Sequence, residues 1–267
     1  MAMPSNKAPG YDRILLFAIK DCLPYVLPTL TALANLSFAS SAFPRAWKKS
    51  VVVPRHKDGD HQIPNNNRPI SLLPVLSKLT EKIALNQFND FLTQQGNLTC
   101  HQSGNRKYHS TETLSLLVTG HIFKAMDKKE ITAMVLTYLS KALDSISHMS
   151  LRLKLQGLGA SSTASKWFQS YLTDRMQSTH GVPQGSILGP LLSSLYMDDL
   201  PSFVKFSSVE SYVDDTKVYL SFSSKDIDFC LTKVTEDLRL IAACCCTNKL
   251  LVNPSKIKLI FFEFDSY

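Results

Sequence analysis

Two strand-like runs surround a pair of aspartates in the stretch VESYVDDTKVYLSF, residues 209–222. The runs Val209–Val213 and Thr216–Phe222 are rich in apolar and β-branched residues, which predicts a β-hairpin with Asp214 and Asp215 as its two-residue tip. Asp-Gly or Asn-Gly would be the ordinary dipeptide at such a tip. Adjacent carboxylates repel each other, and a divalent cation would remove that cost. The tip is therefore a candidate metal site, with plain turn chemistry as the alternative interpretation.

Outward from this hairpin, the chain alternates predicted helices and strands without internal repeats. Ile131–Leu139 is a nearly unbroken apolar run of strand length, which predicts a strand buried on both faces. Further strands are expected at Lys49–Arg55, ahead of a polar loop at His56–Asn67, and at Lys256–Phe262. Helices are expected at residues 12–22 and 28–41, from Pro74 to a stop at Gly96, from Ser110 onward, at 149–157 and 161–173, from about Ser186, and at 224–247.

Composition places the chain among ordinary globular proteins. Its 267 residues are 44% hydrophobic and 19% charged, enough to bury a sizeable core. The net charge of +7 comes from basic residues that are spread along the chain. Such a balance mildly favours a polyanionic partner, because Lys and Arg neutralise a phosphate backbone, although many basic proteins bind no polyanion.

Cysteine usage and hydropathy exclude several classes. The six cysteines include no C-x-x-C pair, so we expect neither a disulfide framework nor a zinc site. No secretory segment is visible at the start of the chain. The apolar stretch Ile14–Phe38 is interrupted by two charges and two prolines, which argues against a spanning helix. We expect a soluble intracellular protein, nuclear or cytoplasmic.

With the two residues before it, the aspartate pair reads Tyr-x-Asp-Asp, residues 212–215, and six further segments follow a recognisable order. They are Asn6–Asp12; Asn67–Leu73 with Lys78 and Glu81-Lys82; Gln102–Arg106 with His109–Thr113; Leu139–Asp144; Gly181–Ser186 with Leu188-Gly189-Pro190; and Asn253–Lys258. Together these segments resemble the sequence boxes of reverse transcriptases from non-LTR, LINE-type retrotransposons. The match at Gly181–Ser186 is the most specific, and the boxes span nearly the whole chain.

The resemblance implies an α+β fold of the right-hand polymerase kind. It has fingers and a palm, an antiparallel palm sheet packed on helices, and a thumb that is absent or truncated. Residues 1–130 would form a fingers-like region with N-terminal helices, and residues 131–267 the palm, with the metal hairpin at 209–222. The implied activity is RNA-directed DNA polymerisation, with an RNA template, a DNA primer and deoxynucleoside triphosphates as partners and no membrane.

The resemblance also implies a metal-dependent reaction centre. Nucleotidyl transfer in this family uses two Mg²⁺ ions, held by carboxylates from two strands. Asp214 and Asp215 would supply the hairpin half of that site. Lys256 could protonate the pyrophosphate leaving group.

Four residues match the nucleotide-binding positions of the family. Lys57 and Arg68 would meet the triphosphate, since an ammonium and a guanidinium fork both suit phosphate oxygens. Gln184 and Gly185 would lie against the incoming nucleotide, where glycine lets the backbone approach closely. Each lysine or arginine, taken alone, could equally be a solvated surface charge.

The palm strand departs from the family pattern. Where relatives have the first metal-binding aspartate, this chain has Tyr138, and a phenol is a poor magnesium ligand. Leu143 occupies a fifth nucleotide-binding position of the family, where relatives have an aromatic that stacks under the sugar. Asp144 keeps the second aspartate of the pattern but lies six positions beyond Tyr138. Only five residues separate Asp174 from His180, fewer than in relatives. We therefore expect impaired catalysis and weakened metal binding.

Three functional hypotheses remain open at this point. The chain is a polymerase domain by descent, a non-catalytic nucleic-acid-binding remnant of a retrotransposon, or a remnant without a stable fold. The first predicts primer extension, the second predicts salt-dependent nucleic-acid binding, and the third predicts no cooperative melting.

Overall fold

The computed structural model describes residues 8–106, 108–140, 142–175 and 181–263. Asn6, Lys7, Lys141 and most of the short connection before His180 lie outside these ranges. The chain forms two compact units, the first from Met1–Asn97 with His148–Gly189 and the second from Leu98–Ser147 with Pro190–Tyr267. The chain passes between the units three times, so they do not coincide with the linear division expected at residue 130. That division into fingers and palm stays a prediction.

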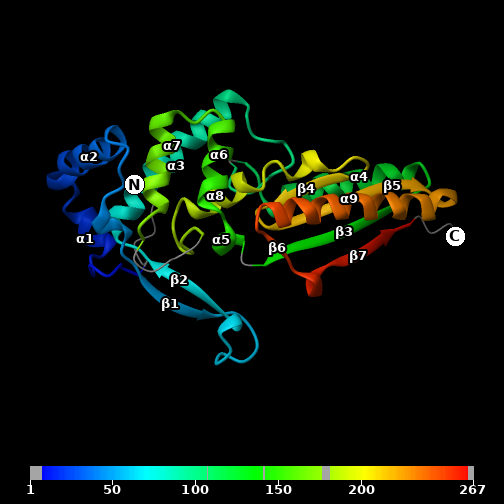
Figure 1. The fold of residues 1–267 in the computed structure, drawn as a ribbon, viewed down its shortest axis with the longest axis horizontal. Coiled ribbons are helices and arrows are strands. Elements are labelled where there is room, and N and C mark those ends of the chain that lie inside the picture. The colour runs from blue at the N-terminus through cyan, green and yellow to red at the C-terminus, as the bar shows by residue number, and fades with distance from the viewer. Residues whose placement is uncertain (1–7, 107, 141, 176–180, 264–267) are drawn as a thin grey trace. The chain divides into compact units, whose positions relative to one another are not determined.

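The first unit is mostly helical (Figure 1). Its elements are α1 (Leu16–Asp21), α2 (Leu23–Ala39), the 3-10 turn η1 (Arg45–Lys48), β1 (Val51–His56), the 3-10 turn η2 (Pro64–Asn66), β2 (Asn67–Leu72), α3 (Val75–Gln95), α6 (His148–Gly157) and α7 (Ser162–Leu172). Helix α3 ends at Gly96 in the left-handed conformation, as its sequence predicts. The helix expected at residues 28–41 begins earlier, at Leu23, so the exposed Pro28 lies inside α2 and the predicted start is wrong.

Strand β2 is an element that the sequence analysis missed. It pairs antiparallel with β1 over six residues, from Val51 opposite Leu72 to His56 opposite Asn67. Each strand carries a proline, and Pro54 lies opposite Pro69. A two-stranded ribbon tolerates this pair because each strand has an outer edge with no strand partner among the described residues and need not donate every amide to a ladder.

Aromatic side chains form the core of the first unit. Trp167 and Tyr171 on α7 stack with ring centroids 5.9 Å apart, and Phe43 meets both rings edge-on. The indole Nε1 of Trp167 donates to the Ser37 hydroxyl at 2.9 Å, so the buried polar atom of the ring is satisfied. These contacts fasten α7 to the end of α2.

The second unit is a five-stranded antiparallel sheet between helices (Figure 1). Its elements are α4 (Thr111–Asp127), β3 (Glu130–Ser140), α5 (Ala142–Ser145), α8 (Gly189–Tyr196), η3 (Leu200–Phe203), β4 (Ser208–Tyr212), β5 (Asp215–Ser223), η4 (Ser224–Asp226), α9 (Ile227–Thr247), β6 (Leu251–Val252), η5 (Pro254–Lys256) and β7 (Lys258–Phe262). The strand order is β4-β5-β3-β6, and β7 also pairs with β3. The predicted α+β class with an antiparallel sheet on helices is confirmed.

Strand β3 is central and covered on both faces, as its unbroken apolar sequence predicts. Met134 and the opposite Tyr219 pack with buried residues of α4. The neighbouring position, Ala133, faces the other way and packs with Phe222 and Cys230, the latter on α9. Alternation along the strand therefore fixes which helix covers which face.

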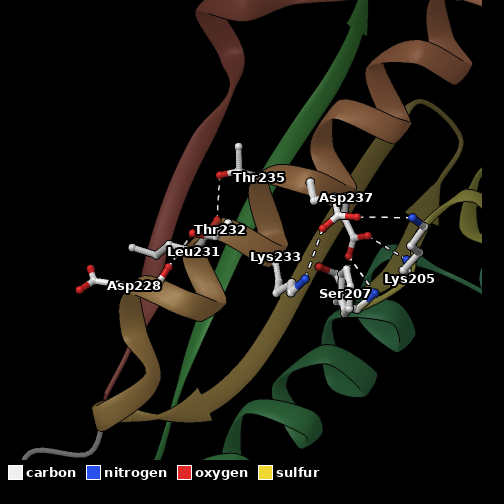
Figure 2. A network of polar contacts seen from close by, with 10 residues as sticks. Lys205, Ser207, Asp228, Leu231, Thr232, Lys233, Thr235 and Asp237 are labelled. Carbon is white, nitrogen blue, oxygen red and sulfur yellow. Dashed lines mark hydrogen bonds and ion pairs between the residues drawn. The ribbon is translucent and has the colours of Figure 1, made fainter.

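A buried carboxylate fastens α9 to the segment that leads into β4 (Figure 2). Asp237 is fully buried and accepts the backbone amides of Lys205, Phe206 and Ser207 at 2.8, 3.0 and 2.7 Å. Burial alone would raise the pKa of Asp237, but these amide donors outweigh it and hold the pKa below its ordinary value. The carboxylate thus anchors the start of the hairpin strand.

Within the described ranges, no helix combines the length and apolar character needed to cross a bilayer.

Candidate active site

The aspartate hairpin has a different tip from the one expected. Tyr212 pairs with Asp215, so the two turn residues are Val213 and Asp214, and the prediction of an Asp214-Asp215 tip is wrong by one position. Asp215 is already the first residue of β5. Val213 has a φ of 58°, a strained value for a β-branched residue. The two carboxylates therefore lie one in the turn and one on the strand.

Tyr138 lies directly across the sheet from the hairpin carboxylates. In the antiparallel register of β3 and β5, its Cα partner is Asp215. The position that the family pattern assigns to a metal ligand thus faces the hairpin, and it carries a half-buried phenol. Asp144 and Leu143 belong to α5, beyond the end of β3 at Ser140. Asp144 is therefore not a strand residue facing the hairpin.

Lys256 covers the tyrosine ring. Strands β6 and β7 both pair with β3, and the η5 turn that joins them carries Lys256. The Asn253 amide donates to the Tyr138 carbonyl at 2.8 Å, which fixes this turn against the strand. As a result, Nζ of Lys256 lies 4.3 Å from the centroid of the Tyr138 ring, within cation–π range.

The local charges act on Asp215 in opposite directions. Partial desolvation and the adjacent Asp214 carboxylate raise the pKa of Asp215, while Lys256 and Lys217 oppose the shift. The net effect leaves the pKa of Asp215 above its ordinary value, so ionising both carboxylates of the pair has an electrostatic cost. The cations that relieve part of this cost belong to the chain itself.

These residues do not fit a pair of divalent ions. The hairpin offers two carboxylates, but the facing strand offers a phenol with an ammonium over its ring, and oxygen-seeking cations need carboxylate or carbonyl ligands. Among the described residues, no group of three His, Cys, Asp or Glu side chains could hold a metal ion.

Two of the predicted nucleotide-binding cations lie on the ribbon of the first unit. Arg68 is an exposed residue of β2, and Lys57 follows the last residue of β1, where its amide donates to the Asn66 carbonyl at 2.8 Å. The register adds a residue that the sequence analysis did not assign, because Arg55 lies directly opposite Arg68. Like charges in direct opposition disfavour the ribbon unless an anion lies between them.

The Pro-Gln-Gly loop, residues 183–188, packs against the same ribbon. The Ser71 amide donates to the Gln184 carbonyl at 2.7 Å. Gly185 has a φ of 101°, and a Cβ built there would lie 2.9 Å from the Ser71 carbonyl oxygen. Only glycine fits this position, so Gln184 and Gly185 are brought to the edge of β2 by backbone contacts.

Glu81 also supports this loop, a role that the sequence analysis did not give it. Its side chain is fully buried on α3 and accepts the amides of Ile187 and Leu188 at 2.7 and 3.3 Å. The Ser77 hydroxyl also donates to it, at 2.8 Å. Burial raises the pKa of Glu81, although the Arg175 charge and these donors oppose that shift. The sequence analysis placed Glu81 in the box of Asn67–Leu73, but nothing in that pattern predicts its hydrogen bonds to the loop amides.

An antiparallel sheet that carries Tyr-x-Asp-Asp on a hairpin, with a glycine-dependent Pro-Gln-Gly loop against a basic ribbon, defines the class of right-hand polymerases. Comparison with known proteins places the chain within that class. Residues 53–264 match the family described as reverse transcriptase (RNA-dependent DNA polymerase), and the chain belongs to this family.

Relatives that resemble the chain come from non-LTR mobile elements of insects. The chain is 32% identical to a probable RNA-directed DNA polymerase from transposon BS of Drosophila melanogaster, over 96% of this chain and 30% of that protein. It is 28% identical to the RNA-directed DNA polymerase from mobile element jockey of the same species, over 81% and 26%. For a Pol polyprotein from element R2 of Popillia japonica the figures are 27%, 72% and 28%. The chain spans less than a third of the length of these relatives.

Proposed function

We propose that this reverse transcriptase domain is impaired in RNA-directed DNA polymerisation, because Tyr138 stands where the palm carboxylate is needed. The observation that carries the proposal is the register of β3 and β5, which sets Tyr138 opposite Asp215, with Lys256 over the ring. A phenol is a much poorer ligand for a divalent metal ion than a carboxylate. The loss lies in the ligand set, and the strands that would carry it are intact.

The remaining residues of the site retain recognisable binding roles. Lys57 and Arg68, joined by Arg55, offer three cations from one ribbon to a triphosphate or a nucleic-acid backbone. Gln184 and Gly185 lie at the edge of that ribbon. There they would contact the incoming nucleotide. Lys256 would protonate the pyrophosphate leaving group if the ligand set were complete, and in this chain its ammonium lies over the Tyr138 ring.

Primer extension on an RNA template with Mg²⁺ or Mn²⁺ tests the proposal. The unmodified chain should incorporate no nucleotide, whereas Tyr138→Asp should restore extension because it returns the third carboxylate. Tyr138→Asn is the matched control, since it removes the ring without adding a charge. Incorporation by the unmodified chain would sink the proposal, and extension by Tyr138→Asn would assign the lesion to the ring instead.

Nucleic-acid binding without polymerisation is the second candidate, favoured by Arg55 opposite Arg68 on an exposed ribbon. Binding through phosphate contacts predicts a linear fall of log affinity with log salt concentration. Arg55→Ala should flatten that slope by about one counterion. The control is Arg239→Ala, at an exposed arginine of α9 in the second unit, and an equal flattening there would reduce the ribbon to general surface charge.

A further inference from the structure

The turn of the aspartate hairpin is gripped by a segment that is far away in sequence. Residues 101–104, which we call the clasp, run along the outer edge of β4 and form a parallel bridge between Gln102 and Ser211. The Ser211 amide donates to the His101 carbonyl and the Ser103 amide donates to the Ser211 carbonyl, both at 2.8 Å. These backbone bonds cover an edge of the sheet that would otherwise be open.

The side chain of Gln102 goes beyond covering the edge and bonds the turn itself. Its Oε1 accepts the amides of Val213 at 3.0 Å and Gly104 at 2.8 Å, and its Nε2 donates to the Val213 carbonyl at 3.3 Å. Gln102 is only 3% exposed, so water does not compete with these bonds. Both backbone polar groups of the strained turn residue are therefore held by one amide side chain.

Gly104 completes the grip by allowing close approach. A Cβ at this position would lie 2.7 Å from both the backbone nitrogen and Cγ2 of Val213. Val213 has a left-handed backbone, which a β-branched residue adopts only when its surroundings impose it. The clasp imposes this conformation through its contacts with Val213, the residue immediately before Asp214.

We infer that Gln102 is a positioning residue, which holds Val213 in its strained conformation and so sets the direction of Asp214. The contacts of Gln102 stand by themselves, and only their consequence for metal binding rests on the proposed function, in which Tyr138→Asp returns the third carboxylate beside Asp214 and Asp215. If Gln102 only stabilised the sheet, the backbone bridge to Ser211 would suffice. Its side chain instead hydrogen-bonds Val213 in the turn, and the backbone of Val213 sets the orientation of the Asp214 carboxylate.

The first test measures amide hydrogen exchange at Val213 by NMR in the unmodified chain, Gln102→Ala and Gln102→Glu. Loss of the acceptor in Gln102→Ala should speed exchange at Val213 about tenfold, with little change inside β5. Gln102→Glu should remain closer to the unmodified chain, because a carboxylate still accepts both amides. Gln156→Ala, at an exposed glutamine of α6, is the control. Unchanged exchange at Val213, or equal acceleration throughout β4 and β5, would overturn the inference.

The second test asks whether Gln102 affects metal binding at the hairpin carboxylates by holding the strained backbone of Val213. In a Tyr138→Asp background, Gln102→Ala should weaken Mn²⁺ binding, followed by electron paramagnetic resonance, by about tenfold. Adding Val213→Gly should reduce that loss, because glycine adopts the left-handed conformation unaided. Equal losses with Val213 and with glycine at this position would overturn the positioning role. If Tyr138→Asp alone binds no Mn²⁺, the proposed function fails, while the exchange experiment still decides the role of Gln102.

Discussion

The Pro-Gln-Gly loop and the aspartate hairpin are supported by the same kind of contact but differ in what they present. Glu81 holds the loop by accepting two backbone amides, and Gln102 holds the hairpin turn by bonding both the amide and the carbonyl of Val213. The loop carries the residues that its family pattern assigns to it, whereas the strand facing the hairpin carries Tyr138. If the proposed function holds, scaffold and chemistry are separable here, because Tyr138 replaces a ligand while β3 and β5 keep their register.

Removal of Glu81 should have the largest effect on stability. Glu81→Ala leaves the amides of Ile187 and Leu188 without their buried acceptor and should cost about 4 kcal/mol. Urea unfolding followed by tryptophan fluorescence measures this cost, because both tryptophans, Trp47 and Trp167, belong to the first unit. Asp90→Ala, at an exposed acid on the same helix, should stay within about 0.5 kcal/mol. A loss below about 1 kcal/mol for Glu81→Ala would show that the loop does not depend on this carboxylate.

Asp237 is the counterpart in the hairpin unit and should show a pH signature. Asp237→Ala removes three hydrogen bonds from backbone amides and should cost about 3 kcal/mol near neutral pH. Because the folded-state pKa lies below the unfolded value, the contribution is present above about pH 4 and is lost as the pH falls through the folded pKa.

The gap in stability between the unmodified chain and Asp237→Ala should therefore narrow below about pH 4, measured by urea unfolding with hydrogen exchange of residues 208–247. Asp228→Asn, an exposed acid on α9, is the control. A gap that stays constant down to pH 2 would contradict the role given to the Asp237 carboxylate.

Glycine substitutions should sharpen the comparison with smaller effects of opposite sign. Gly185→Ala forces a Cβ against the Ser71 carbonyl at a φ of 101° and should destabilise the first unit by about 2 kcal/mol. Gly157→Ala, at the end of α6 with open space around it, should stabilise by up to about 1 kcal/mol. Tryptophan-monitored unfolding reports both changes. Equal changes in the free energy of unfolding at the two positions would contradict the steric argument, because they would mean that the loop accommodates a Cβ at residue 185.

Local patterns predicted the regular elements well. Helix α3 with its Gly96 stop, the start of helix α4 near Ser110 and the central strand β3 all follow from local periodicity and turn chemistry. Strand β2 was missed because its two-stranded ribbon contains paired prolines, which ordinarily argue against a strand. The hairpin tip was misplaced by one residue because Val213 adopts a backbone that its side chain disfavours.

The family boxes named the site residues but not the residues that support them. Glu81 reaches amides 106 and 107 positions away, and Gln102 reaches an amide 111 positions away. No local pattern encodes such contacts, because they depend on how the elements pack. The cation–π contact of Lys256 with Tyr138 was hidden for the same reason, since it requires the β3 register and the η5 turn together.

Mn²⁺ titration of the unmodified chain beside Tyr138→Asp, followed by electron paramagnetic resonance, tests the central claim most directly. The account predicts that Tyr138→Asp binds at least about tenfold more tightly, since a third carboxylate joins the hairpin pair. Asp214→Asn should remove that gain. Equal affinity in the two proteins, lost in both on Asp214→Asn, would show that the hairpin holds its metal without a palm carboxylate and would contradict the account.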